Sequence, residues 1–101
     1  MIMLSFYVSE KQRHDGMPLY EWLLEEAKAM GVHGGSVFRA IAGFGRHGHM
    51  HEETFFELAG ELAAKVEFIL EDALAEQLLE KVRDQGMKLF YVKQPVEAGG
   101  I

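Results

Sequence analysis

The chain has 101 residues, which suits one domain built around a single core. Its formal net charge is −6, with 10 Lys and Arg against 16 Asp and Glu, and this balance argues against a protein that coats nucleic acid. It contains no cysteine, which excludes disulfides, thiolate metal sites and cysteine nucleophiles. No run has the character of a signal peptide or a membrane span, so we expect a cytoplasmic protein without membrane insertion.

The first segments predict a strand and then a helix. Apolar residues alternate along 2–8, which is typical of a half-buried strand. Residues 9–16 are polar and end in glycine, so we expect a loop there, with Pro18 in the first turn of the following helix. The helix is predicted to run to Met30, with Gly31 as its stop. Its buried stripe is predicted to comprise Leu19, Trp22, Leu23, Ala27 and Met30.

The middle of the chain predicts a second strand followed by a long loop. Residues 36–42 alternate in the same way as the first strand. The loop covers about 43–64 and begins with the sequence GFGRHGHMHEE at 43–53. Its later part has an amphipathic cast, but Gly60 weakens a long helix, so we expect one or two irregular turns.

The last segments predict a third strand, a second helix and a fourth strand. Residues 65–70 alternate again, and Asp72 is a suitable cap for a helix that Gly86 ends. Residues 88–92 form the last predicted strand. The second helix is predicted to turn toward the core the residues Leu74, Leu78, Leu79 and Val82.

This order predicts one α+β domain over 1–101, with the ferredoxin-like βαββαβ arrangement. Its four-stranded antiparallel sheet would carry two helices on one face. Alternating residues on the other face are apolar or aromatic in at least two strands. We therefore expect a homo-oligomer that covers this face.

Three alternating histidines in the long loop raise the question of a metal site. In an extended segment His47, His49 and His51 would point to one side, where neutral imidazoles can bind zinc, copper or nickel. Exposed or anion-contacting histidines are the alternative, because the sequence indicates neither a fourth ligand nor a second shell of contacts to the rings.

The start of the same loop has the composition of an anion site. Glycines at 43 and 45 allow backbone N–H groups to approach an anion, and Arg46 supplies a bidentate donor. A glycine turn without a ligand is the alternative, since the chain has no complete phosphate-binding motif. No nucleophile or acid–base pair stands out, and we predict that the protein is not an enzyme.

Residues 16–53 resemble the small PII-like proteins grouped as domain of unknown function 190. The matching motifs are a G-x-P-L-Y helix start, a G-[AG]-[ST]-V-x-R strand and a GFG loop that ends in His. They fall here on Gly16, Pro18, Leu19 and Tyr20, on Gly34 to Val37 with Arg39, and on Gly43 to Gly45 with His51.

The resemblance implies a ferredoxin-like subunit of a homotrimer, with a long loop between strands two and three that contacts a protein partner. By similarity to PII itself, it implies a small anionic ligand in clefts between subunits, for which adenine nucleotides are the model. The segment GMKLFYV is similar to the PII stretch in which a glycine and a lysine contact phosphate. The implied ligand-binding residues are Arg39, Gly43, Phe44, Gly45, Arg46, His49, His51, Gly86 and Lys88. The alternative is a trimeric metal-binding protein similar to divalent-cation tolerance proteins, with the three loop histidines as ligands.

Overall fold

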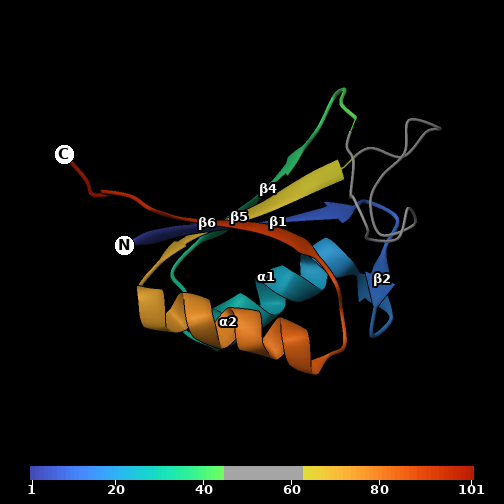
Figure 1. Ribbon diagram of the computed structural model, residues 1–101, viewed down its shortest axis with the longest axis horizontal. Helices are drawn as coiled ribbons and strands as arrows, with labels where there is room; N and C mark the ends of the chain where they lie inside the picture. Colours follow the sequence, from blue (N-terminus) through green and yellow to red (C-terminus); the bar gives the residue numbers. More distant parts are fainter. Residues whose placement is uncertain (45–62) are drawn as a thin grey trace.

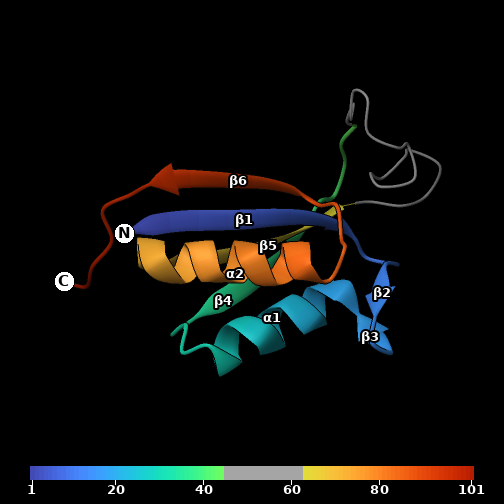
Figure 2. The same cartoon turned by 60° about the horizontal axis from the view of Figure 1, so that its bottom comes forward.

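A four-stranded antiparallel sheet with two helices on one face forms the body of the protein (Figures 1 and 2). The computed structural model describes residues 1–44 and 63–101. Its elements are β1 (Ile2–Ser9), β2 (Arg13–His14), β3 (Met17–Pro18), α1 (Leu19–Ala29), β4 (Gly35–Arg39), β5 (Ala63–Leu70), α2 (Asp72–Asp84) and β6 (Phe90–Pro95). The order across the sheet is β4-β5-β1-β6. The predicted ferredoxin-like fold class is therefore confirmed.

The core lies between the two helices and the two central strands. Leu4 and Phe6 of β1 and Val66 and Phe68 of β5 are at most 1% exposed, and they alternate with residues of the open face as a half-buried strand requires. The helices close this layer with the apolar side chains Leu19, Trp22, Leu23, Ala27, Ala75, Leu78, Leu79 and Val82. The predicted stripes are confirmed, with Met30 and Leu74 partly buried at the core margin.

The bounds of β4, β5 and β6 differ from the predicted ones. β4 covers Gly35–Arg39 and not 36–42, since its pairing with β5 ends where the amide of Ala40 donates to the carbonyl of Ala63. β5 begins at Ala63, two residues earlier than predicted. β6 covers Phe90–Pro95 and not 88–92, because its ladder with β1 continues past the apolar run to polar residues that an edge strand tolerates.

A short hairpin replaces the loop predicted over 9–16. β2 and β3 pair across Asp15 and Gly16, which have φ values of 53° and 80°. Positive φ at both central residues is the geometry of a type I′ turn, for which Asp-Gly is a preferred pair. The guanidinium of Arg13 donates to the carbonyl of Gly16 at 2.6 Å. Pro18 belongs to β3 and occupies the N-cap position of α1, so its placement in the first helical turn was wrong.

Lys93 of β6 ties the edge of the sheet to α2. Its ammonium forms an ion pair with Asp72 at 3.1 Å and contacts Glu76. Hydrogen bonds to Glu76 and then Asp72 raise the pKa of Lys93 above its ordinary value of 10.5. Asp72 is the first helical residue and Glu71 holds the N-cap position without a side-chain hydrogen bond, so the predicted Asp72 cap was wrong.

Neither described helix is long and apolar enough to cross a membrane.

Candidate functional site

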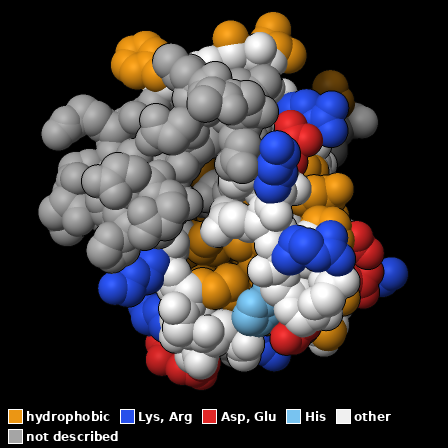
Figure 3. Space-filling view, turned by 90° about the vertical axis from the view of Figure 1, so that its right-hand side faces the viewer, with side chains coloured by type: hydrophobic (Ala, Val, Ile, Leu, Met, Phe, Trp, Pro, Cys, Tyr) orange, Lys and Arg blue, Asp and Glu red, His pale blue; other side chains and the backbone are white. Residues whose placement is uncertain are grey.

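Four strand ends meet at one end of the sheet. β1 and β4 finish there, while β5 and β6 begin there, because all neighbouring strands are antiparallel. The predicted ligand-binding residues that the structure describes belong to this end, either in β4 and the residues after it or in the connection that leads to β6. Figure 3 looks onto this end and shows Lys and Arg side chains spread around apolar ones.

Arg39 and Glu10 form an ion pair at the β4 corner of this end. The Nε of Arg39 lies 3.1 Å from Oε2 of Glu10, and the two side chains are 70% and 33% exposed. Both residues line an open hollow of about 230 Å³, together with Tyr20, Val37 and Ala64. The hollow thus combines a guanidinium, a carboxylate and a phenol with an apolar wall.

A tight turn holds Glu10 beside β4. The amide of Ser9 donates to Oε1 of Gln12 at 2.8 Å, and the amide of Gln12 donates to the carbonyl of Ser9 at 3.1 Å. The amide of Lys11 donates to the Ser9 hydroxyl at 3.1 Å. The carbonyl of Gln12 accepts from the amide of Leu19 at 2.8 Å, which fastens the turn to the start of α1. The turn after β1, the start of α1 and the end of β4 therefore meet around the hollow.

The open sheet face carries an aromatic row next to this corner. The register places Phe38, Lys65, Tyr7 and Phe90 side by side across all four strands. The ammonium of Lys65 lies 5.3 Å from the ring centroid of Phe38, and the rings of Tyr7 and Phe90 are 5.6 Å apart. A second hollow of about 240 Å³ adjoins the row, and Arg39 is also part of its lining. The apolar character predicted for the open face is present, while its cover by another subunit stays a prediction.

The connection from α2 to β6 brings Gly86 and Lys88 to the same end. Gly86 has a φ of 76°, and its amide donates to the carbonyl of Arg83 at 2.9 Å. This left-handed conformation ends α2, so the helix terminus alone explains a glycine there. Lys88 is exposed two residues before β6. Because β6 and β4 are opposite edges of the sheet, the structure places Lys88 and Arg39 on opposite sides of this end.

The remaining predicted residues are only partly described. Gly43 and Phe44 follow β4, and both are exposed. Gly45, Arg46, His47, His49 and His51 lie outside the described residues, so their part in a ligand or metal site stays a prediction. Within the ranges 1–44 and 63–101, no group of three or more His, Asp or Glu side chains could hold a metal ion.

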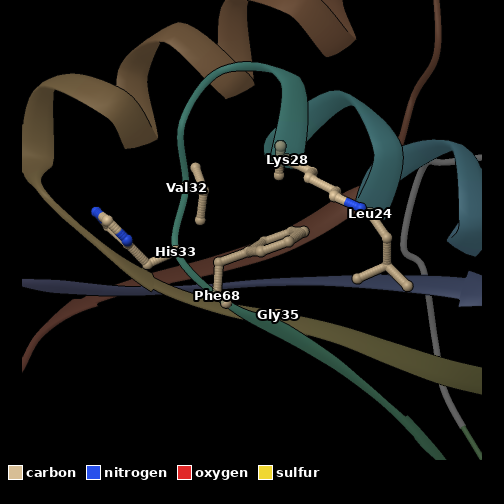
Figure 4. A pocket seen from close by; sticks show the side chains of 8 residues that line it. Leu24, Lys28, Val32, His33, Gly35 and Phe68 are labelled. Atoms are coloured by element: carbon tan, nitrogen blue, oxygen red, sulfur yellow. The ribbon is translucent and has the colours of Figure 1, made fainter.

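A third hollow, of about 280 Å³, lies between the C-terminal half of α1, the turn that follows it, and β5 (Figure 4). The ring of Phe68 lies between Leu24 and Val32, and the imidazole of His33 is turned away from it. The side chain of Lys28 extends from α1 toward Leu24. Since β4 begins here and its other end carries Arg39, this hollow is separate from the corner at Arg39.

Sequence reasoning missed Glu10 and gave Tyr20 no chemical role. Tyr20 was visible as part of the G-x-P-L-Y motif, and Arg39 as part of the strand motif. Their meeting depends on the strand order, which places the end of β4 beside the turn after β1 and the start of α1. In the sequence Glu10 is one acidic residue in a polar turn, and nothing there indicates that it pairs with Arg39.

Comparisons with known proteins give a family and a fold. Residues 1–98 match the model of the family DUF190, described as Uncharacterized ACR. A UPF0166 protein of Aquifex aeolicus (strain VF5) is 37% identical over 81 residues, which are 80% of this chain and 77% of that protein. A crystal structure of a protein of Thermus thermophilus, described as PII-like and signaling, is similar with a TM-score of 0.60 and 14% identity. The likeness covers 92% of this chain and 83% of that one, and at this identity it shows a shared fold.

Proposed function

The chain belongs to the DUF190 family, and from this premise we propose that it is a PII-like regulatory protein and not an enzyme. In this proposal it forms a homotrimer and binds a small anionic ligand in clefts between subunits. Residues 43–53 contact a protein partner. The family match and the shared fold support the regulatory class.

The position of two basic residues carries the proposal of an inter-subunit site. Arg39 ends one edge strand and Lys88 precedes the other, both at the same end of the sheet. The two edge strands are separated by three strand spacings, or about 14 Å. A contact that places the β4 edge of one subunit near the β6 edge of the next would bring the two charges around one ligand.

Such a contact also favours a ring. It joins two different surfaces of the subunit, and a contact of this kind closes into a cyclic oligomer when its rotation permits. The aromatic row of Phe38, Tyr7 and Phe90 offers apolar surface that the same assembly would cover. A two-fold dimer joins the same surface of both subunits, so the smallest closed ring that joins two different surfaces is a homotrimer.

The chemistry of the basic residues suits phosphate or carboxylate. Arg39 presents a planar fork that can bind an oxyanion in bidentate fashion, and Lys88 adds a point charge. In sequence, Gly43, Gly45 and Arg46 follow Arg39 closely and would add backbone N–H groups and a further guanidinium. Adenine nucleotides are the first ligands to test.

Calorimetry on untagged protein tests the proposal. ATP, ADP and AMP are titrated into wild type, Arg39→Gln and Lys88→Gln, after light scattering has established the assembly state. We expect at least one nucleotide to bind wild type and to bind both variants more weakly. A folded trimer that gives no heat with any nucleotide would contradict nucleotide binding, and a monomer would contradict the inter-subunit site.

A further inference from the structure

We propose that Glu10 is a specificity-determining residue that competes with the anionic ligand for Arg39. This inference rests on the proposed function, because it assumes that Arg39 contacts the ligand. The carboxylate of Glu10 lies 3.1 Å from the Arg39 Nε and so occupies one of the guanidinium donors that a phosphate or carboxylate of a ligand can use. An incoming anion must therefore displace Glu10 or bind beside it.

Either route weakens the binding of multiply charged anions. Displacement breaks an ion pair between partly exposed side chains, and binding beside Glu10 places like charges within a few ångströms of each other. The repulsion grows with the charge of the ligand, so a polyphosphate loses more affinity than a monoanion. Glu10 thereby discriminates among anions by their charge.

Hydrogen bonds hold the backbone around Glu10 in place beside the end of β4. Glu10 lies in the turn closed by the Ser9 and Gln12 hydrogen bonds, and Gln12 is bonded to Leu19 of α1. Tyr20, the next residue of α1, lines the same hollow as Glu10 and Arg39. Because the turn and the helix are fastened together, the backbone of Glu10 does not need to be ordered anew each time the pair forms. A pre-ordered competitor is more effective than a flexible one.

The chain offers a matched control for the charge change. Glu26 of α1 pairs with Lys81 of α2 at 3.2 Å, and its side chain is 29% exposed, against 3.1 Å and 33% for Glu10. Glu10→Gln and Glu26→Gln therefore remove the same charge from ion pairs of similar length, at side chains of similar exposure. Only the first substitution frees Arg39.

The test is titration calorimetry with inorganic tripolyphosphate on wild type, Glu10→Gln, Glu26→Gln and the double variant Glu10→Gln/Arg39→Gln. We expect Glu10→Gln to bind about three- to tenfold more tightly than wild type. Glu26→Gln should match wild type, and the double variant should lose the gain.

Three outcomes would overturn the inference. If Glu10→Gln binds no more tightly than Glu26→Gln while wild type binds, Glu10 does not compete, and the proposed function stands. If the gain persists in the double variant, it does not arise at Arg39. If no variant binds tripolyphosphate, including the one with Arg39 freed, both the inference and the anionic-ligand proposal fail.

Discussion

A Cβ atom at Gly35 would lie 2.5 Å from Cε1 and 2.7 Å from Cδ1 of Phe68. The first residue of β4 therefore has no room for a side chain while the ring keeps its place. Phe68 is 1% exposed and packs edge-on against Phe6 at a centroid distance of 6.5 Å, so a shift of the ring disturbs this contact. The motif admits glycine or alanine at this position, and in this chain the glycine leaves room for the Phe68 ring.

Replacing Gly35 tests this packing. We predict that Gly35→Ala lowers the free energy of unfolding by about 1–3 kcal/mol, because its methyl group overlaps the Phe68 ring, which must shift from its place against Phe6. Urea denaturation followed by circular dichroism measures the change. Gly34→Ala is the control, since a Cβ at Gly34 meets nothing within 4 Å. A loss of stability equal to that of the control would contradict the contact, and Phe68→Leu in the Gly35→Ala background should restore part of the loss.

The tie between Lys93 and α2 predicts a pH dependence at alkaline pH. Hydrogen bonds to Glu76 and Asp72 raise the folded-state pKa of Lys93 above 10.5, so the tie stabilises fully below pH 10.5. This stability is lost as the pH rises through the folded-state pKa. We predict that wild type is more stable than Lys93→Gln at roughly pH 8, and that the difference shrinks above pH 10.5. Urea denaturation of both proteins across this range measures it, and a difference that does not change with pH would contradict the assignment.

The aromatic row on the open face predicts where a charge disrupts assembly. Phe90 is 48% exposed and lies on the open face, whereas its neighbour Tyr91 is 43% exposed and pairs with buried Phe6 on the helix face. We predict that Phe90→Glu shifts the protein toward monomers, because it places a charge in the subunit contact. Light scattering coupled to size exclusion measures the shift. Tyr91→Glu should keep the wild-type mass, and equal dissociation by both variants would mean that the open face is not the specific contact.

The metal hypothesis makes a separate prediction for His47, His49 and His51. If these residues bind metal, untagged protein holds one transition metal ion per subunit, and His49→Ala/His51→Ala loses it. His33→Ala is the control. His33 is exposed in the turn between α1 and β4, and residues 43–53 follow the other end of β4 in the sequence. Elemental analysis by mass spectrometry reads out all three proteins. Metal-free wild type, or metal retained by the double variant, would exclude these ligands.

The order of the elements was predictable because the hydrophobic period changes clearly along the chain. Alternation marked β1 and β5, which are central strands with one buried face, and the stripe on α1 followed its helical period. The edges were less certain. β6 ends in Lys93, Gln94 and Pro95, and the apolar pattern gives no reason to extend a strand over them. Only the ladder with β1 does so.

The β2–β3 hairpin and the contacts of the site were not predicted from the sequence. Asp15-Gly16 is a preferred pair for a hairpin turn, but the two-residue strands on either side of it, β2 and β3, are too short to show an alternating apolar pattern. For the site, motifs pointed to Arg39 and Lys88, and the strand order shows that they belong to opposite edges of the sheet. The contact of Arg39 with Glu10 depends on the fold in the same way.

Mixing of subunits tests most directly whether the ligand site is shared. Arg39→Gln and Lys88→Gln proteins are each assembled alone, and then unfolded and refolded together. An inter-subunit site predicts that each parent binds nucleotide weakly, while the refolded mixture as a whole recovers wild-type affinity at about one interface in four, because random cyclic assembly pairs an intact Arg39 with an intact Lys88 that often. Calorimetry on the mixture counts these sites. A mixture that binds no better than its parents, while wild type treated in the same way binds fully, would contradict a site shared between subunits.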